Sequence, residues 1–413
     1  MSALLDSLAT AFDGDERRRP ALDAALRDGL PGPRSEAWKY TSLRALERRA
    51  FAVPGEAVAT FDASLVAGIP SPRIVFVNGR FDAAHSDIGG LPDGVTFVAA
   101  AAEQAVNGEG LPPAAVFARL NAALSREGVH LRAAAGTDCG LPVHLVSIGV
   151  GPGADVAWHL RHRIELEAGA SISLVEHQLA DGGHRHLENV VTTIRLGEDA
   201  RLVHARHQST ADGATSFLHT DARLAASARY ERLDLELGGA LSRHELDVRL
   251  EGADSRVVAN GVLLATGKRH VDTRLGIEHA ATGTACELLW RGIGTDRGRV
   301  VFHGGITIHE GADGSDANLS NKNLLLGDGA EIDTQPVLVI HADEVKAAHG
   351  ATVGQLDPTA LFYLRTRGLP IDQARRLLTT AFVREPLAVV GEPAVREMLQ
   401  ARLDGTLQAL VVR

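Results

Sequence analysis

The sequence contains only two cysteines, Cys139 and Cys286, which lie far apart in a chain of 413 residues. A disulfide between them remains open, but a secreted scaffold held together by many disulfides is excluded. A Cys-x-x-Cys metal knuckle is excluded as well, because that spacing does not occur. Metal chemistry based on this chain's thiolates alone is therefore not expected.

The chain also lacks a basic excess and long apolar runs. Its formal net charge is −10, whereas general nucleic-acid binding needs a basic surface that displaces phosphate counterions. No stretch reaches roughly 18 uninterrupted apolar residues, so no membrane span is predicted. The first residues, MSALLDSLATAFDGDERRRP, lack the basic and apolar segments of a secretory signal. We expect a cytoplasmic protein that binds neither nucleic acid nor membrane.

Two common catalytic loops are absent. The stretch GVLLATGKR, residues 261–269, has one residue too many between its glycines, and Arg269 stands where a phosphate-binding loop needs Ser or Thr. A Gly-x-Ser-x-Gly nucleophile elbow does not occur either. If ATP drives the system, another protein must hydrolyse it.

Apolar and polar residues alternate with period two between about residues 140 and 345. From 155 to 166, the even positions are mostly apolar, whereas the odd positions include Asp155, His159 and Glu165. The same alternation returns in 246–251, 271–277 and 300–308. These segments predict strands with one buried face and one solvent-exposed face.

The spacing of the turns favours a β-solenoid. Glycines recur at intervals of roughly 14 residues from Gly169 to Gly327, with one gap near Ala225 where Ala-Ala-Ser replaces the glycine. Such a repeat suits a solenoid in which each coil covers its neighbour. A large β-sandwich or barrel, whose strands recur every 8–12 residues or so, remains the alternative.

Both ends of the chain predict helices. Leucines near the N-terminus recur at helical spacing, and a hairpin is expected around Asn78-Gly79. Near the C-terminus, Asp357 and Pro358 are typical of a helix start, and a second helix follows Pro370. We divide the chain into an N-terminal helical domain with a short hairpin (1–138), a β-solenoid core (139–350) and a C-terminal helical domain (351–413).

Eighteen histidines raise the alternative of a stand-alone, cupin-like metal-dependent enzyme that uses His184, His186 and Glu188. Two ligands on one strand reach the same metal only at even spacing. His159 and His162 fail that test. His184 and His186 pass it, but they lie at an expected turn, where we predict solvent-exposed side chains. The two hypotheses are separated by metal analysis of the isolated protein.

Other histidines and a cysteine are assigned by their register. His279 continues an apolar register, which predicts a hydrogen-bonded histidine in the core. Cys286 shares its register with Leu288 and Trp290, which predicts a buried, unreactive thiol. His303 and His309 fall in the polar register and are expected to be exposed.

The most specific stretch runs from Asn318 to Phe382. It contains Leu-Leu, Gly-Asp, Ala-Glu-Ile, Pro-x-Leu-x-Ile, Asp-x-Val-Lys, His-Gly-Ala-Thr and Phe-Tyr-Leu-Arg-x-Arg-Gly. Upstream, Ser35 to Leu46 reads SEAWKYTSLRAL. These motifs resemble the SufB/SufD family of scaffolds in SUF iron–sulfur cluster assembly, over nearly the whole chain. The chain length, the few cysteines and the Trp-Lys-Tyr-Thr element favour the SufD-like branch.

The resemblance implies a mainly β fold: a right-handed parallel β-helix core flanked by N-terminal α/β and C-terminal helical domains. It also implies a non-catalytic scaffold that pairs with a SufB-like subunit and a SufC-like ABC ATPase, with a homodimer as a further possibility. The cofactor is a transient iron–sulfur cluster shared with a partner, and none is expected to stay bound to this chain alone. The ATPase-docking residues are expected in the two C-terminal helices: Leu361, Phe362, Leu364, Leu377, Leu378 and Phe382.

The resemblance points to His349 as the residue at the cluster-assembly interface and as the metal ligand. Many relatives carry Cys-Ser before the His-Gly-Ala-Thr motif, but this chain has Ala347-Ala348. The thiolate must then come from the partner, while a neutral imidazole at His349 still binds iron. A cluster held by one chain normally uses four cysteines, which this chain lacks. A purely structural role for His349, in capping the last coil or bonding a turn, remains the alternative.

Overall fold

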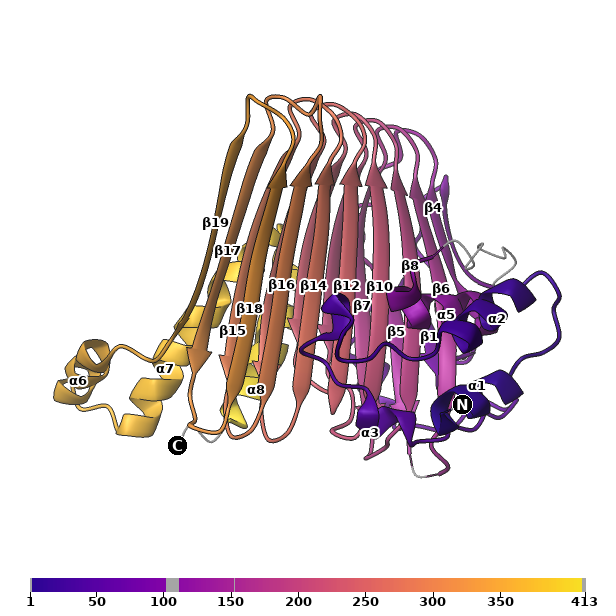
Figure 1. Cartoon of the computed structure of the whole chain (residues 1–413), viewed down its shortest axis with the longest axis horizontal. Helices are drawn as coiled ribbons and strands as arrows, with labels where there is room; N and C mark the ends of the chain where they lie inside the picture. Colours follow the sequence, from indigo (N-terminus) through magenta and orange to yellow (C-terminus); the bar gives the residue numbers. More distant parts are fainter. Residues whose placement is uncertain (1, 102–110, 152, 411–413) are drawn as a thin grey trace.

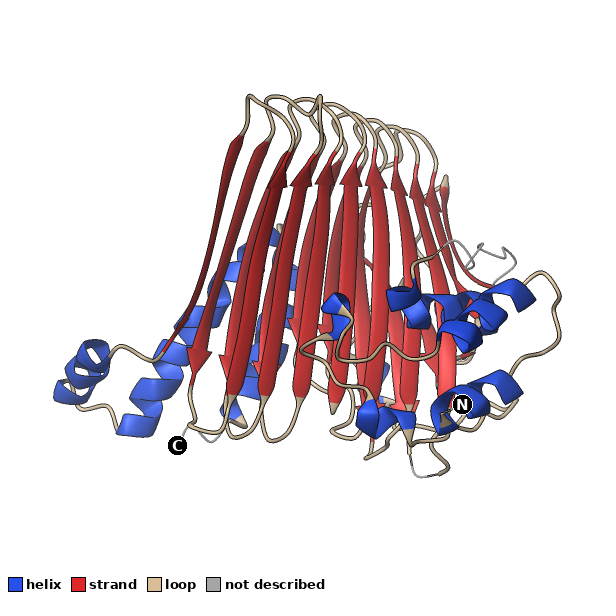
Figure 2. Cartoon of the chain, in the orientation of Figure 1, coloured by secondary structure: helices blue, strands red, loops and turns tan. Residues whose placement is uncertain are grey.

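The structure, a computed structural model, describes residues 2–101, 111–151 and 153–410. Two long sheets form a parallel β-solenoid of about eight turns, and helices lie at both ends of the chain (Figures 1 and 2). The predicted fold class, a mainly β solenoid with flanking helices, is confirmed. The sandwich or barrel alternative is wrong, because strands of the same sheet pair in parallel with the strand one coil away.

The N-terminal segment contains helices and short strands: α1 (Ala3–Thr10), α2 (Arg19–Asp28), η1 (Glu36–Trp38), α3 (Arg44–Glu47), α4 (Ser64–Ala67), η3 (Pro113–Ala115) and α5 (Val116–Leu124). The C-terminal segment contains α6 (Pro358–Thr366), α7 (Ile371–Arg384), η4 (Glu385–Val389) and α8 (Pro393–Gln408). Asp357 caps α6 by accepting a hydrogen bond from the Thr359 N–H, as its position before Pro358 predicts.

The ten-stranded sheet consists, in spatial order, of β19 (Lys346–Gly354), β17 (Asp316–Leu325), β15 (Ala285–Gly294), β13 (Arg256–Ala265), β11 (Arg229–Glu236), β9 (Arg201–Gln208), β7 (Ser171–Asp181), β5 (Val143–Val150), β1 (Arg73–Val77) and β2 (Arg80–Phe81). The nine-stranded sheet consists of β18 (Glu331–Ile340), β16 (Arg299–Ile308), β14 (His270–His279), β12 (Leu241–Leu250), β10 (Thr215–Leu224), β8 (Leu187–Leu196), β6 (Ala157–Leu166), β4 (Glu127–Ala133) and β3 (Val95–Ala101). The hairpin predicted at Asn78-Gly79 joins β1 to β2.

One coil contains one strand of each sheet. Leu241 in β12 lies opposite His270 in β14, and His270 lies opposite Arg299 in β16, so each step along the sheet takes 29 residues. The turn interval of roughly 14 residues in the sequence is therefore half a coil. Each inner strand of the solenoid gains parallel hydrogen bonds on both sides from coils that are adjacent in the sequence.

A ladder of residues with positive φ forms one corner of successive coils: Gly136, Gly169, Asp199, Ser227, Asp254, Gly283 and Gly314. Glycine adopts this left-handed conformation without steric cost, and Asp and Ser adopt it only in special turns. Ser227, with φ of 55°, lies in the Ala-Ala-Ser stretch. The prediction that this stretch replaces a turn glycine is confirmed.

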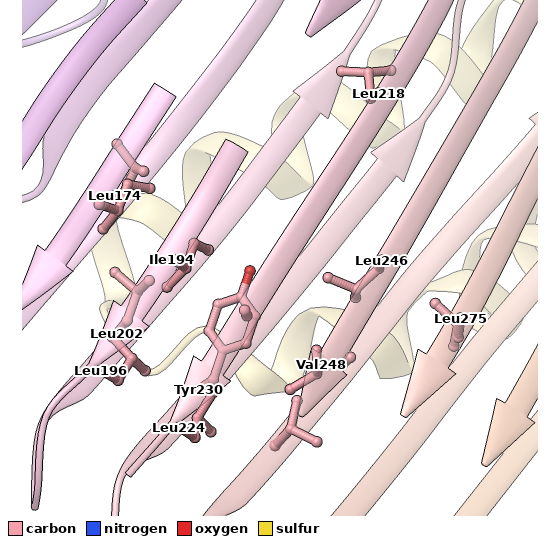
Figure 3. Packing of buried hydrophobic residues seen from close by; sticks show 14 of the residues in the cluster. Leu174, Ile194, Leu196, Leu202, Leu218, Leu224, Tyr230, Leu246, Val248 and Leu275 are labelled. Carbon is pink, nitrogen blue, oxygen red and sulfur yellow. The ribbon is translucent and has the colours of Figure 1, made fainter. Parts of the chain in front are cut away.

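The solenoid interior is apolar along much of its length. Leucine, isoleucine and valine side chains from both sheets meet there, and Figure 3 shows Leu202, Leu224 and Val248 among them. Each such side chain, once buried, contributes about 1.5–3 kcal/mol to folding. The coils are thus held together by stacking of like positions across neighbouring strands.

In β11 the usual arrangement is reversed, because apolar side chains face outward and charged side chains face the interior. Leu233 and Leu235 face outward and pack against the C-terminal helices, whereas Arg232 and Asp234 are buried inside the solenoid, where they bond each other. Period-two alternation is present, as in the other strands. The polar set occupies the inside because a second apolar layer covers the outside.

The two sets of helices cover different sheets. In Figure 1, the indigo N-terminal helices lie in front of the strands labelled β6 and β8, and the yellow α8 lies behind the solenoid. The N-terminal core includes Leu187 and Phe217 of the nine-stranded sheet. The core of α7, η4 and α8 includes Leu235 and Val262 of the ten-stranded sheet.

The Trp-Lys-Tyr-Thr element fastens the N-terminal segment to the solenoid. Trp38 donates from Nε1 to the Ala114 carbonyl (2.9 Å), and the Arg243 guanidinium lies 3.8 Å from its ring centroid. Thr41 Oγ1 donates to Asp272 Oδ2 (2.6 Å), which also pairs with Arg243 at 2.5 Å. We call Trp38, Thr41, Arg243 and Asp272 the N-terminal clasp.

The prediction that the odd positions of β6 are solvent-exposed is wrong at His159. His159 is buried because α5 covers this part of the sheet. Asn189 contacts the His159 ring at Nδ1 (3.0 Å) and donates to the Phe117 carbonyl of α5 (2.8 Å). Among the described helices, none is both long and apolar enough to cross a bilayer.

Candidate functional site

His349 lies near the middle of β19, the last strand of the ten-stranded sheet. β19 pairs with β17 along one edge, and within the described ranges no strand pairs with its other edge. β18 ends the nine-stranded sheet in the same way. We call β18 and β19 the open end. Unpaired N–H and C=O groups on such edges are available for pairing with another chain.

The register directs His349 toward the solenoid axis. Its Cα partner on β17 is Leu319, which is buried and belongs to the core. Ala347, two residues earlier, packs against that core. Because side chains on a strand alternate, His349 continues the same inward row, yet it is exposed because no further coil covers it.

The His349 side chain is free of local bonds: among residues 2–101, 111–151 and 153–410, none forms a hydrogen bond or ion pair with its ring. A neutral imidazole offers one nitrogen lone pair to a metal. One ligand cannot hold iron in a stable site, because iron–sulfur clusters take several protein ligands. His349 therefore offers at most one ligand to a metal site.

Two buried asparagines lie in β17, the strand that pairs with the strand of His349, and the sequence analysis did not identify them. Asn321 and Asn323 occupy the inward row of β17 and are buried. Asn321 Oδ1 accepts hydrogen bonds from Asn323 Nδ2 (2.6 Å) and from Thr334 Oγ1 (2.8 Å) across the solenoid. The signal in the sequence is their even spacing, because the other residues on that face of the strand are apolar. This spacing could have identified the pair.

Neither cysteine can supply a thiolate at this site. Cys286 is buried in the core as predicted, and its desolvation raises the pKa of the thiol to about 12. Burial also raises the pKa of the Cys139 thiol. A thiolate is the nucleophile and the metal ligand. Both thiols are therefore protonated at neutral pH, and any thiolate that meets His349 comes from another chain.

The six apolar residues expected in the C-terminal helices are exposed or half-buried. Phe362 is 69% exposed and Leu377 is 50% exposed. Leu361, Leu364 and Leu378 are half-buried. Phe382 is also half-buried, and the Arg291 guanidinium lies over its ring, 5.7 Å from the centroid of the ring. α6 stands apart from the solenoid in Figure 1, with Tyr363, which the sequence analysis did not select, 55% exposed.

The prediction that His184 and His186 are solvent-exposed is wrong, since both are buried. His186 bonds the Val150 carbonyl through Nε2 (2.8 Å), and its Nδ1 accepts from the Val156 N–H (3.2 Å). Burial lowers the pKa of His184 to about 4 and also lowers that of His186. Both ring nitrogens of His186 are thus occupied by the backbone.

Glu188, the third residue of the cupin-like alternative, lies in a separate network. Its carboxyl group accepts hydrogen bonds from Ser147 Oγ (2.8 Å) and Gln178 Nε2 (3.1 Å), and burial raises its pKa. In the described part of the chain, the side-chain groups with metal-ligand spacing do not include His184, His186 or Glu188. The geometry does not support the alternative enzyme.

The remaining register predictions have mixed outcomes. His279 is fully buried, and its Nδ1 lies 2.8 Å from Thr284 Oγ1, which confirms a hydrogen-bonded core histidine. His303 and His309 are half-buried rather than exposed. His309 lies 3.2 Å from the Glu278 carboxylate, so an ion pair with a neighbouring strand covers part of its ring.

Comparisons with known proteins place these observations in one family context. Residues 150–382 match the family model described as SUF system FeS cluster assembly, SufBD core domain. The chain is 33% identical to the iron–sulfur cluster assembly protein SufD of Escherichia coli, over 94% of this chain and 91% of that protein. It is 29% identical to an iron–sulfur cluster assembly SufBD family protein of Synechocystis, over 90% and 86% of the two chains.

Proposed function

Since the chain belongs to the SufBD family of the SUF iron–sulfur cluster assembly system, we propose that it is a SufD-like scaffold subunit that pairs with a SufB-like subunit and a SufC-like ATPase. The cluster forms transiently at the junction with the SufB-like subunit. The observation that carries the proposal is His349: an inward-facing, unbonded imidazole on the uncovered last strand of a solenoid.

The ligand count supports a shared cluster. His349 offers one nitrogen, and the two thiols of this chain are buried and protonated. A cluster ordinarily needs four protein ligands. The partner must therefore supply the thiolate, and the cluster leaves once it is complete. In this proposal, the chain acts by positioning a ligand and performs no turnover alone.

The open end supports pairing with a second solenoid. β18 and β19 expose apolar side chains, with Val339 40%, Ile340 43% and Val353 43% exposed. Addition of strands to these two edges would satisfy their free backbone groups and cover those side chains. A homodimer through the same edges is the expected state when the SufB-like subunit is missing.

The ATPase docks, in this proposal, on α6 and α7. The exposed Phe362 and Leu377, together with Leu361, Leu364, Leu378 and Phe382, form the apolar contact. Interfaces concentrate their binding energy in such aromatic and aliphatic anchors. α6 follows β19 after a short connection, so movement of the docked ATPase reaches the open end directly. The complex resides in the cytoplasm.

The test is His349→Ala, assayed with the SufB-like and SufC-like proteins of the same organism. We expect an intact complex by size-exclusion chromatography, because the ring makes no structural bond, and a loss of about tenfold or more in cluster formation. The matched control is His341→Ala, which removes another exposed histidine beside β18. Equal cluster formation by the His349 variant would contradict the proposal.

A further inference from the structure

A network of ionised side chains lies inside the solenoid, away from the open end. Arg206 of β9 donates to Asp234 Oδ1 (2.8 Å) and also pairs with Glu236. Arg232 of β11 donates to the same Asp234 carboxylate (2.7 Å). Glu176 of β7 approaches His204 at 2.9 Å. All of these groups are buried.

The carboxylates of this network outnumber its guanidinium groups. Glu176, Asp234 and Glu236 face Arg206 and Arg232, and the imidazole of His204 is the remaining partner of Glu176. An uncompensated charge in a dry interior is costly, by several kcal/mol or more. A cation bound among the carboxylates would lower that cost.

His244 of β12 faces this network from the opposite sheet. Its side chain is fully buried, and neither ring nitrogen has a hydrogen-bond partner among the described residues. Nδ1 lies 3.7 Å from Glu236 Oε1 and 3.9 Å from Asp234 Oδ2. These distances are too long for hydrogen bonds, so a proton on His244 would not be held by a short bond to either carboxylate.

The same distances fit a shared ion. Two ligand atoms that each lie about 2.0–2.2 Å from one ion are at most about 4.4 Å apart. Neither ring nitrogen of His244 is engaged by a described residue, so a neutral ring has a lone pair free to bind an ion between the two carboxylates. We propose that Asp234, Glu236 and His244 bind a divalent first-row transition metal, such as Zn²⁺ or Fe²⁺, inside the solenoid.

The surrounding bonds would orient these ligands. Ser242 Oγ donates to Glu236 Oε2 (3.0 Å), while Oε1, which pairs with Arg206, is the oxygen that faces His244. Arg232 Nε donates to Asp234 Oδ2 (3.0 Å), and each carboxylate oxygen has two lone pairs, so an arginine and an ion can share one oxygen. One imidazole and two carboxylates form a ligand set that Zn²⁺ and Fe²⁺ both accept.

This site is independent of the proposed function, because it belongs to the isolated chain and does not include His349. Since it is enclosed, the ion would enter during folding and would resist chelators afterwards. The site would brace β11 against β12 across the interior, by joining two strands of one coil that belong to different sheets.

The experiment measures the metal content of the full chain, produced alone in medium containing zinc, iron and manganese and washed with EDTA. We expect about one metal ion per chain by mass spectrometry, and anomalous scattering from a crystal at Asp234, Glu236 and His244. The variant His244→Gln should hold about tenfold less metal or lower. The variant His186→Gln, at another buried histidine, should keep the full amount.

A wild-type chain without bound metal, or a metal that stays in the His244 variant, would overturn the proposal. Metal lost on changing His186 instead would also overturn it and would favour the cupin-like enzyme. If His244→Gln does not fold, refolding of the wild-type chain decides: Zn²⁺ added after chelation must raise its unfolding temperature. Cluster formation with the partner proteins is not part of this readout, so the two proposals can fail separately.

Discussion

The two ends of the solenoid consist of the same kind of coil, but they differ in whether other segments of the chain cover them. At the start, helices and the hairpin cover the first strands, and even the polar residues His159 and Asn189 are buried. The N-terminal clasp extends this cover to β12 and β14. At the other end, β18 and β19 have exposed or half-buried side chains along their whole length. A terminal coil buries its inner row only if something stacks on it. The comparison teaches that burial of the inner row depends on what covers a coil, and that the open end lacks such a cover within the described residues.

The largest loss of stability is expected from a substitution in the N-terminal clasp. Trp38→Ala should lower the free energy of unfolding by about 3–5 kcal/mol, because it removes a buried aromatic ring that packs on Phe117 and Arg243. Urea unfolding followed by circular dichroism measures this loss. Lys39→Ala, a change at the neighbouring exposed residue, should cost less than about 0.5 kcal/mol. Equal losses in the two variants would show that the clasp does not hold this end.

Acid should weaken the covered end before the open end. Burial lowers the pKa of His144 and His162 to about 4 and that of His159 to about 3. The unfolded chain, with histidine pKa values near 6.5, binds these protons first. Stability is therefore complete above about pH 6.5 and falls as the pH drops toward 4, by on the order of 2 kcal/mol for each of these histidines at pH 5.

Hydrogen exchange at pH 7 and pH 5, corrected for the intrinsic rate, locates this effect. Protection should fall more in β5, β6 and β8 than in β16, whose His303 is half-buried, and in β17, which contains no histidine. If protection falls equally along the whole solenoid, the buried histidines are not the cause of a difference in acid stability between its two ends.

The smallest effect is expected at His349 itself. Two histidines in inward rows can be compared: His279, buried and bonded to Thr284, and His349, exposed and unbonded. His279→Ala should cost about 1–3 kcal/mol, since it removes a fully buried ring together with its hydrogen bond to Thr284. His349→Ala should change stability by less than about 0.5 kcal/mol. A large loss at His349 in thermal unfolding would favour a structural role in capping the last coil.

The solenoid was predictable because its signals are local and repeated. Period-two alternation and regular turns mark each half-coil, and even Ser227 was found as a replacement for a turn glycine. The sequence could not show which polar face would be covered. His159, His184 and His186 were expected in solvent, but they are buried through contacts with parts of the chain distant in sequence.

The interior network was missed for a related reason. In β11, Leu233 and Leu235 alternate with Arg232 and Asp234 as in any half-exposed strand, and alternation alone does not say which set points inward. That choice depends on the C-terminal helices, which offer an apolar layer on the outside. His349 was found by its motif, whereas its exposure depends on its place in the last coil.

The path of the chain after β19 has a mechanical consequence. The C-terminal helices turn back from the open end and share one core with β7, β9, β11, β13 and β15. Five neighbouring coils are thereby tied along one side, whereas β16 and β18 of the nine-stranded sheet contribute no described residue to a core shared with helices. We expect the rod to flex mainly by opening and closing that unsupported side, so that the distance between the tips of β18 and β19 fluctuates most.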